Sequence, residues 1–216
     1  MRSIGIFGGT FDPVHWGHLI LAETALNQIP LEYVIWVPSL NPPHKQATSF
    51  EHRVEMLQLA TRDNPFFTIS LVEVNRSGTS YAINTLLELS AFYPNTHWYW
   101  ILGLDAILTL PRWYRGRELV QMCDWLIAPR LVGGENIAQT ELICKQLDEE
   151  LQKKSYTINW QLLHIPVVGL SSTLIRQKCS DGSANAKGER QSIRYLVPES
   201  VRLYIAAQNL YFDKSK

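Results

Sequence analysis

Short apolar segments alternate with amphipathic helical patterns along almost the whole chain. Such alternation predicts a parallel sheet, because parallel strands need helical crossovers that cover both faces of the sheet. The predicted fold is therefore α/β, a Rossmann-like doubly wound parallel sheet. The expected strands are residues 3–7, 33–37, 67–71, 97–102, 125–128 and 162–165, and the expected helices are 17–28, 51–62, 81–92, 136–154 and a last one after Pro198.

The length of 216 residues predicts a single domain over 1–216. Residues 1–165 are expected to form the parallel core, and residues 166–216 to carry a phosphate-binding segment and C-terminal helices. Ser80 is expected to cap the helix at 81–92, and Pro198 to lie in the first turn of the last helix. The polar, low-complexity segment 180–191 is expected to be a dispensable surface loop.

Charge and composition favour a small-molecule substrate. Lys+Arg and Asp+Glu both number 20, so no net field favours nucleic acid or a membrane surface as a partner. The start of the chain lacks the apolar run and cleavage site of a signal peptide, and the three cysteines lack metal-ligand spacing. We therefore expect a cytoplasmic protein without disulfides.

A glycine-rich segment, GGTFDPVHWGH from Gly8 to His18, joins the first expected strand to the first expected helix. Glycines let the backbone approach a ligand, and N–H groups at a helix start favour an anion. His15 and His18 are three residues apart, so both imidazoles are expected to face one phosphate chain, with Gly17 leaving it room. The spacing is neither a P-loop nor a dinucleotide fingerprint. The alternative is a glycine-rich turn with two helix-capping histidines.

A second segment, GLSSTLIR from Gly169 to Arg176, follows the last expected strand. Its three hydroxyl side chains can cap a helix and donate to a nucleotide. Arg176 lies four residues after Ser172 and is expected to face the same way, toward phosphate oxygens. Taken alone, this segment also fits an ordinary capped helix with a solvated arginine.

Together the two segments resemble the HxGH nucleotidylyltransferase superfamily, with Leu170 where isoleucine is usual. The resemblance implies in-line attack of a substrate phosphate on the α-phosphorus of a nucleoside triphosphate, with release of pyrophosphate. It implies Mg²⁺ carried by the ATP phosphates, with no protein ligands to the metal. The implied catalytic residues are His15, His18 and Arg176. The implied ATP-binding residues are Gly8, Gly9, Thr10, Phe11, His15, Gly17, His18, Asp105, Ser171, Ser172, Thr173 and Arg176.

Segments in the middle of the chain are similar to those of the bacterial nicotinate-mononucleotide adenylyltransferases, which make nicotinate adenine dinucleotide for NAD biosynthesis. These segments are PPHK at 42–45, SY at 80–81, GLD at 103–105, RWY at 112–114 and SIRYLVP at 192–198. The resemblance implies substrate contacts from Lys45, Tyr81, Ala82, Trp113, Tyr114 and Arg130. Several have simpler readings: Asp105 as a helix cap, Trp113 as a core residue and Lys45 as a solvated loop lysine.

Two departures from the family pattern leave alternatives open. Ala82 stands where the family usually has threonine, so one hydroxyl contact to the substrate is missing and nicotinamide mononucleotide or another phosphorylated substrate is a rival. About eight residues are inserted before Ser192 by comparison with the family. Rival families are phosphopantetheine adenylyltransferases and cytidylyltransferases, and the non-enzyme rival is a nucleotide-binding module. A homo-oligomer is also left open.

Overall fold

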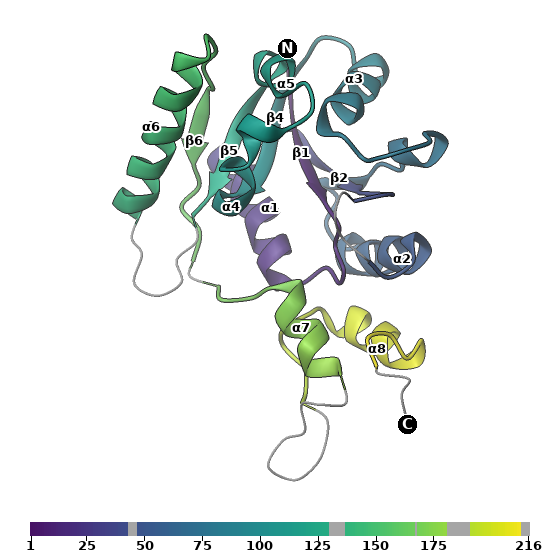
Figure 1. The fold of residues 1–216 in the computed structure, drawn as a ribbon. Helices are drawn as coiled ribbons and strands as arrows, with labels where there is room; N and C mark the ends of the chain where they lie inside the picture. The colour runs from purple at the N-terminus through teal and green to yellow at the C-terminus, as the bar shows by residue number, and fades with distance from the viewer. Residues whose placement is uncertain (43–46, 130–136, 167, 181–190, 213–216) are drawn as a thin grey trace.

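The computed structural model describes residues 1–42, 47–129, 137–166, 168–180 and 191–212 (Figure 1). Within them lies one parallel sheet of six strands in the order β3-β2-β1-β4-β5-β6. This is the doubly wound arrangement, so the predicted α/β fold is confirmed. The strands are β1 (Arg2–Gly9), β2 (Tyr33–Pro38), β3 (Phe67–Ile69), β4 (Thr96–Gly103), β5 (Cys123–Ala128) and β6 (Trp160–Leu162).

Helices cover the two faces of the sheet, and side chains alternate between them along each strand. Phe7 of β1 joins the core on the side of α1 and α2, whereas Ile4 and Ile6 join the core on the side of α3, α5 and α6. The helices are α1 (Trp16–Gln28), α2 (Phe50–Thr61), α3 (Ala82–Phe92), α4 (Leu104–Ile107), α5 (Gly116–Met122), α6 (Ile137–Lys153), α7 (Ser172–Cys179) and α8 (Glu199–Ala207), with 3₁₀ turns η1 (Val72–Asn75) and η2 (Leu110–Arg112).

The strand order reverses between β1 and β4, which pair side by side in the middle of the sheet. Crossovers from these strands run in opposite directions, and in folds of this kind ligands bind outside the carboxyl ends of such strands, which here are Gly9 and Gly103. The α7 and α8 helices lie beyond that end of the sheet, at the bottom of Figure 1. They are joined to the core by hydrogen bonds from Trp16 N to Leu196 O and from the Ser200 hydroxyl to Leu59 O.

Several expected boundaries were wrong. The last strand pairs Trp160 with Trp125 and ends at Leu162. The Leu163 N–H still donates to Ile127 O at 2.9 Å, and the Leu163 and Ile165 side chains pack against the core on the α1 side. The third strand ends at Ile69, before the η1 turn begins.

The expected roles of two residues at helix starts were also wrong. Tyr81 is the N-cap of α3, because the Ser80 hydroxyl is used instead by the Glu73 carboxylate and the Asn41 N–H. Pro198 is the N-cap of α8 and so precedes its first turn. The predicted loop at 180–191 lies outside the described residues except at its two ends.

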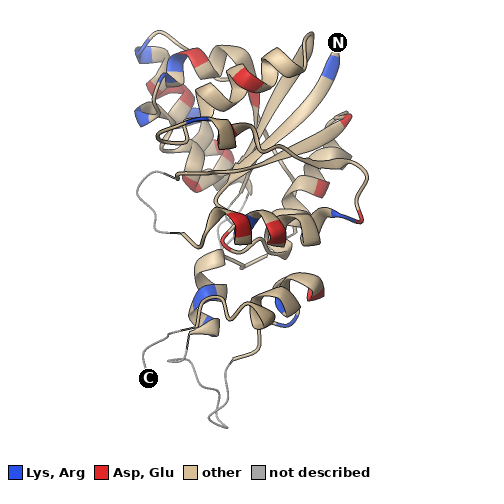
Figure 2. Cartoon of the chain, turned by 90° about the vertical axis from the view of Figure 1, so that its right-hand side faces the viewer, with Lys and Arg blue, Asp and Glu red and all other residues tan. Residues whose placement is uncertain are grey.

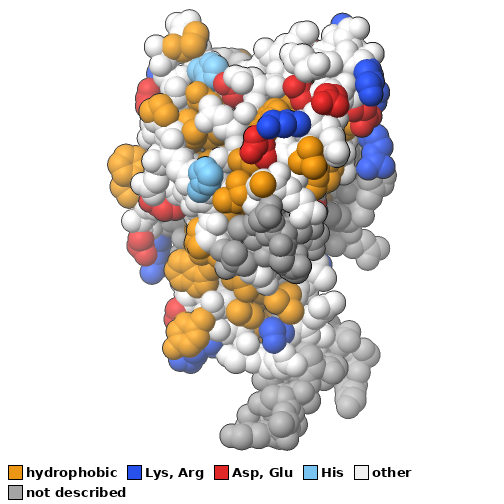
Figure 3. All heavy atoms as spheres, turned by 90° about the vertical axis from the view of Figure 1, so that its left-hand side faces the viewer, with side chains coloured by type: hydrophobic (Ala, Val, Ile, Leu, Met, Phe, Trp, Pro, Cys, Tyr) orange, Lys and Arg blue, Asp and Glu red, His pale blue; other side chains and the backbone are white. Residues whose placement is uncertain are grey.

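Positively and negatively charged residues are interspersed along the ribbon in Figure 2, and their side chains are interspersed on the opposite face, which Figure 3 shows. Among the described residues, no helix has both the length and the apolar character that a membrane crossing needs.

Candidate active site

The loop after β1 is built around the buried ring of Phe11. This residue has a left-handed backbone, with φ of 50°, and its ring packs against Phe7 and Trp36. The ring also meets the His18 imidazole edge to face, with centroids 5.2 Å apart. Because the Phe11 side chain is in the core, only its main chain is left to meet ATP, and its predicted role in ATP binding stays a prediction.

His15 and His18 form a stacked pair at the start of α1. Their ring centroids are 3.7 Å apart and the ring planes differ by 23°. His15 is the N-cap of the helix, and its backbone N–H donates to Nδ1 of His18 at 3.2 Å. An acceptor at Nδ1 places the proton of the neutral His18 imidazole on Nε2, which makes Nε2 a donor. The structure therefore brings the two predicted histidines together at one helix start.

Burial keeps both imidazoles neutral. It lowers the pKa of His15, whose exposed fraction is 5 %, to about 4. The pKa of His18 is also well below its ordinary value, first because of burial and then because of the neighbouring His15. His15 Nδ1 is buried and has no hydrogen-bond partner among the described residues. At neutral pH the pair thus presents N–H donors rather than cations.

Gly17 makes room for a protein side chain. A Cβ atom at this position would lie 3.1 Å from both Nδ1 and Cε1 of the His15 ring. Any larger residue would therefore press on His15 and disturb the stack. The sequence-based reason for Gly17 was space for the triphosphate, and the structure adds this closer constraint.

The second predicted segment docks on the loop that carries the histidines. Ser172 donates from its hydroxyl to Pro13 O at 2.9 Å, and Arg176 donates from Nη1 to Asp12 O at 2.7 Å. The two side chains thus face the same way, as their spacing predicts. Ser171 caps α7 by accepting from Leu174 N, and Thr173 is exposed on the first turn.

Residues predicted to bind the substrate meet at the start of α3. The Tyr81 and Tyr114 rings lie 4.6 Å apart at 33°, and both are partly or largely exposed. No side chain caps the start of α3. Trp113 is half-buried against the core on the α3 side, and its Nε1 donates to the Thr109 hydroxyl at 2.7 Å. The structure thus gathers Tyr81, Ala82, Trp113 and Tyr114 from two segments.

The remaining predicted residues fall in different places. Asp105 is exposed in the first turn of α4, where Gly103 is the N-cap. The predicted residues Lys45 and Arg130 lie outside the described residues. No group of three or more His, Cys, Asp or Glu side chains in the described ranges could hold a metal ion.

Buried polar residues that the sequence reasoning missed hold the loops around the site. The Asp12 carboxylate accepts from Thr48 N, and Glu73 accepts from Leu40 N, so both carboxylates hold the loop after β2. Arg53 is buried in the same region. One signal was readable for it: Arg53 shares the apolar face of its helix with Met56 and Leu57, three and four residues on.

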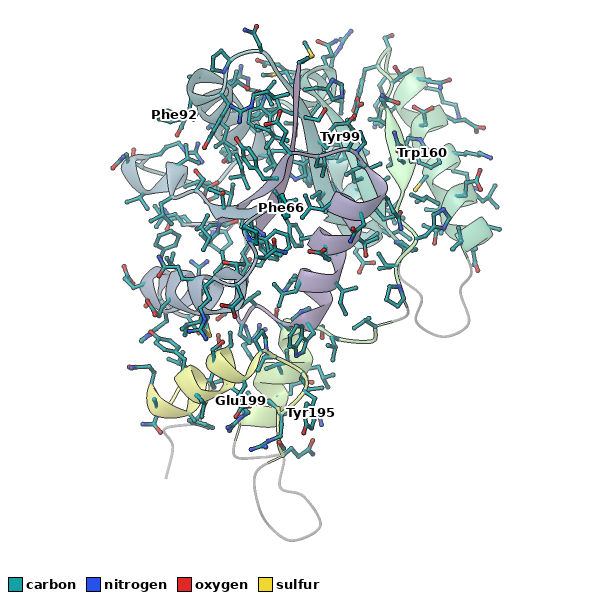
Figure 4. All side chains as sticks on the ribbon, turned by 180° about the vertical axis from the view of Figure 1, so that it is seen from behind. Phe66, Phe92, Tyr99, Trp160, Tyr195 and Glu199 are labelled. Carbon is teal, nitrogen blue, oxygen red and sulfur yellow. The ribbon has the colours of Figure 1, made fainter. Side chains whose placement is uncertain are left out.

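A separate cavity of about 670 Å³ lies between α1, α2 and the start of α8. Glu199, labelled in Figure 4, lies at its α8 side. The lining includes none of the residues predicted for the site, so the cavity plays no part in the chemistry considered below.

Comparisons with known proteins agree on one family. Residues 6–178 match the family model described as cytidylyltransferase-like. A probable nicotinate-nucleotide adenylyltransferase of Nostoc sp. is 67% identical over 216 residues, with all of both chains covered. Another from Synechococcus sp. is 43% identical, with 98% of each chain covered. A solved structure of Plasmodium falciparum nicotinic acid mononucleotide adenylyltransferase complexed with NaAD has the same fold, with a TM-score of 0.75, 22% identity and 98% of each chain covered.

Proposed function

The chain belongs to the cytidylyltransferase-like family and, within it, to the nicotinate-nucleotide adenylyltransferases of NAD biosynthesis, and we propose that His15 and His18 are the centre of its adenylyl transfer. The reaction joins nicotinate mononucleotide to the AMP part of ATP and gives nicotinate adenine dinucleotide and pyrophosphate. The observation that carries the proposal is the stacked histidine pair at the start of α1, with Arg176 bonded to the same loop.

The reaction is a displacement at phosphorus. An oxygen of the mononucleotide phosphate attacks the α-phosphorus of ATP and forms a new P–O bond. The bond from that phosphorus to the bridging oxygen breaks, and pyrophosphate leaves with the bonding electrons. Catalysis of this kind needs positioning and donors aimed at developing negative charge.

The His18 Nε2–H is the donor best suited to the α-phosphate. Its direction is held by the hydrogen bond that Nδ1 accepts from His15 N and by the edge of the Phe11 ring. The positive end of the α1 dipole adds to its effect on an anion. The imidazole is neutral, so it has a single N–H, and the acceptor role of Nδ1 leaves that N–H on Nε2 for a phosphate oxygen.

Arg176 is proposed to bind the phosphates of the leaving pyrophosphate. One side of its guanidinium is held by Asp12 O, and Nη2 reaches only weakly to Thr173 at 3.4 Å. A planar guanidinium has five N–H donors, so donors remain for phosphate oxygens. Ser171, Ser172 and Thr173 shape the helix start beside it.

The nicotinate ring is proposed to lie near the Tyr81–Tyr114 pair. The uncapped start of α3 at Ala82 offers backbone N–H donors to the substrate carboxylate. The Tyr114 N–H is a further proposed donor, since the Trp113 N–H already donates to Leu110 O at 3.0 Å. Lys45 and Arg130 remain proposed substrate contacts and Asp105 a proposed ribose contact.

Magnesium is proposed to arrive as MgATP, because Mg²⁺ commonly binds through substrate phosphates and few protein carboxylates. The test is activity in excess chelator, which should be lost and should return on adding Mg²⁺. Full activity in chelator would contradict the proposal. We further propose a single catalytic domain acting in the cytoplasm, and a homo-oligomer stays a prediction.

The function is tested by pyrophosphate release with ATP against a panel of substrates: nicotinate mononucleotide, nicotinamide mononucleotide and phosphopantetheine. We expect release with the first to exceed release with the others. Calorimetric titration with ATP, run alongside, distinguishes the non-enzyme alternative. Binding of ATP without pyrophosphate release from any mixture would support a nucleotide-binding module instead.

A further inference from the structure

Arg53 is a buried cation bonded to main-chain carbonyls. It lies on α2 with an exposed fraction of 1 %. Nη1 donates to Thr10 O at 2.9 Å and to Ser39 O at 2.8 Å, and Nε donates to Thr48 O at 2.9 Å. Nη2 reaches Leu40 O more weakly at 3.4 Å. One guanidinium therefore joins the loop after β1 to both ends of the loop after β2.

No carboxylate forms an ion pair with this guanidinium within the described part of the chain. The nearby Asp12 carboxylate is bonded to Thr48 N and the Tyr211 hydroxyl instead. Burying a charge is costly unless it is fully hydrogen-bonded, so these carbonyls offset much of the cost. The positive charge of Arg53 is thus left directed at the backbone of the two loops.

The hydrogen bond from Arg53 to the Thr10 carbonyl also affects the Phe11 N–H, which belongs to the same peptide group. A trans peptide points its N–H opposite to its C=O, and Thr10 C=O shares its peptide with the Phe11 N–H. A hydrogen bond to the carbonyl polarises the group and strengthens the N–H as a donor. The Phe11 N–H has no hydrogen-bond partner among the described residues.

We propose that Arg53 is a positioning residue for adenylyl transfer, which ties the Thr10–Phe11 peptide to the loop after β2 so that the Phe11 N–H faces the phosphates. The proposal rests on the proposed function of the histidine site. Arg53 acts through the backbone and does not touch substrate. Its removal frees two loops at once, and neither has another buried cation among the described residues to replace it.

The test compares Arg53→Lys and Arg53→Met with Arg62→Met as the matched control. Lysine keeps the charge but lacks the planar fork that reaches several carbonyls, and methionine keeps the apolar stem. Arg62 ends the same helix, is exposed and pairs with Asp63 only at 3.5 Å. Two readouts are needed: kcat per folded molecule, with the folded fraction from circular dichroism, and amide hydrogen exchange at residues 9–12 and 39–41.

We expect kcat and kcat/KM to fall together by about 10- to 100-fold in both Arg53 variants, since a small misplacement costs this much. Exchange at residues 9–12 should become faster while exchange in α3 stays as in the wild type. Arg62→Met should change neither readout.

Unchanged exchange at residues 9–12, or an unchanged kcat per folded molecule, would overturn the proposal. If Arg53→Lys does not fold, the proposal is tested with Arg53→Met alone. If neither variant folds, it is tested by following activity and amide exchange of the wild type during partial urea titration. Loss of activity ahead of global unfolding, together with faster exchange at 9–12, would support the proposal, and simultaneous loss would overturn it. If the wild type releases no pyrophosphate with nicotinate mononucleotide, the proposed function is contradicted. Amide exchange at residues 9–12 would then be the measurement that tests whether Arg53 holds the loop.

Discussion

Tyr211 donates a hydrogen bond of 2.7 Å to the carboxylate of Asp12, although the two residues are 199 positions apart in the chain. Burial, followed by the nearby Asp12 charge, raises the pKa of Tyr211, so its hydroxyl stays a donor. The carbonyl of the same Asp12 accepts from Arg176. The loop that leads into the histidine pair is therefore held by two residues from the last part of the chain.

Replacing Tyr211 with Phe should destabilise the protein by about 1.5–3 kcal/mol, because the Asp12 carboxylate loses a buried donor. The measurement is the free energy of unfolding from urea titration. Tyr195→Phe is the control, since Tyr195 is 83 % exposed. A Tyr211→Phe variant as stable as this control would show that the hydrogen bond contributes nothing.

Replacing His18 with Ala should lower kcat by about 10²–10³-fold, as removal of a donor aimed at developing charge usually does. The fold should persist, because α1 keeps its buried leucines and alanines. His164→Ala is a matched control, since that side chain is exposed and lies outside the site. Steady-state assays of both variants decide, and a His18→Ala rate close to that of the control would end the assignment.

The protein should become less stable as the pH is lowered, because His15 is protonated more readily in the unfolded chain. Its folded pKa of about 4 lies below the ordinary 6.5, so below pH 6.5 the unfolded chain takes up a proton that the folded protein refuses. The contribution is fully present above pH 6.5 and decreases as the pH falls toward 4, by which point about 3 kcal/mol of stability has been lost. NMR titration of the His15 ring tests the pKa directly. A midpoint near 6.5 would show that the ring is not desolvated.

Wild type should prefer nicotinate mononucleotide to its amide, and Ala82→Thr should widen that preference. The backbone N–H at Ala82 serves a carboxylate without the hydroxyl, and threonine adds a donor. The comparison is kcat/KM for both mononucleotides at saturating ATP. Ala82→Ser controls for the hydroxyl without the methyl group. If the wild type prefers nicotinamide mononucleotide, the prediction is wrong, and Ala82 would be associated with a change of substrate specificity.

Much of the fold follows from local pattern, because a buried parallel strand and an amphipathic crossover each have their own period. The same reasoning placed the last strand at 162–165, since Leu162, Leu163 and Ile165 are apolar whether they pair with β5 or pack on the core. Hydrophobicity alone does not distinguish those two ways of burying a side chain.

The two motifs predicted that His15 and His18 lie together and that Ser172 and Arg176 face the same way, because both depend on spacing within a helix start. Arg53 and Asp12 escaped prediction for the opposite reason. Their partners belong to segments that meet only in the folded chain, and apart from the Tyr211 hydroxyl they are backbone carbonyl and N–H groups, which any residue type supplies. The spacing of residues along the sequence therefore does not indicate such contacts.

The Asp12–Tyr211 bond also bears on how the protein is made. During translation Asp12 and the two histidines are made early, and Tyr211 is made almost 200 residues later. Strand β1 is equally incomplete at first, since its neighbour β4 begins only at Thr96. A growing chain therefore holds the glycine-rich loop in a form that lacks its later supports. The Asp12 carboxylate gains the Tyr211 hydroxyl only when translation has passed residue 211, so the last support of this loop forms after almost the whole chain has been made.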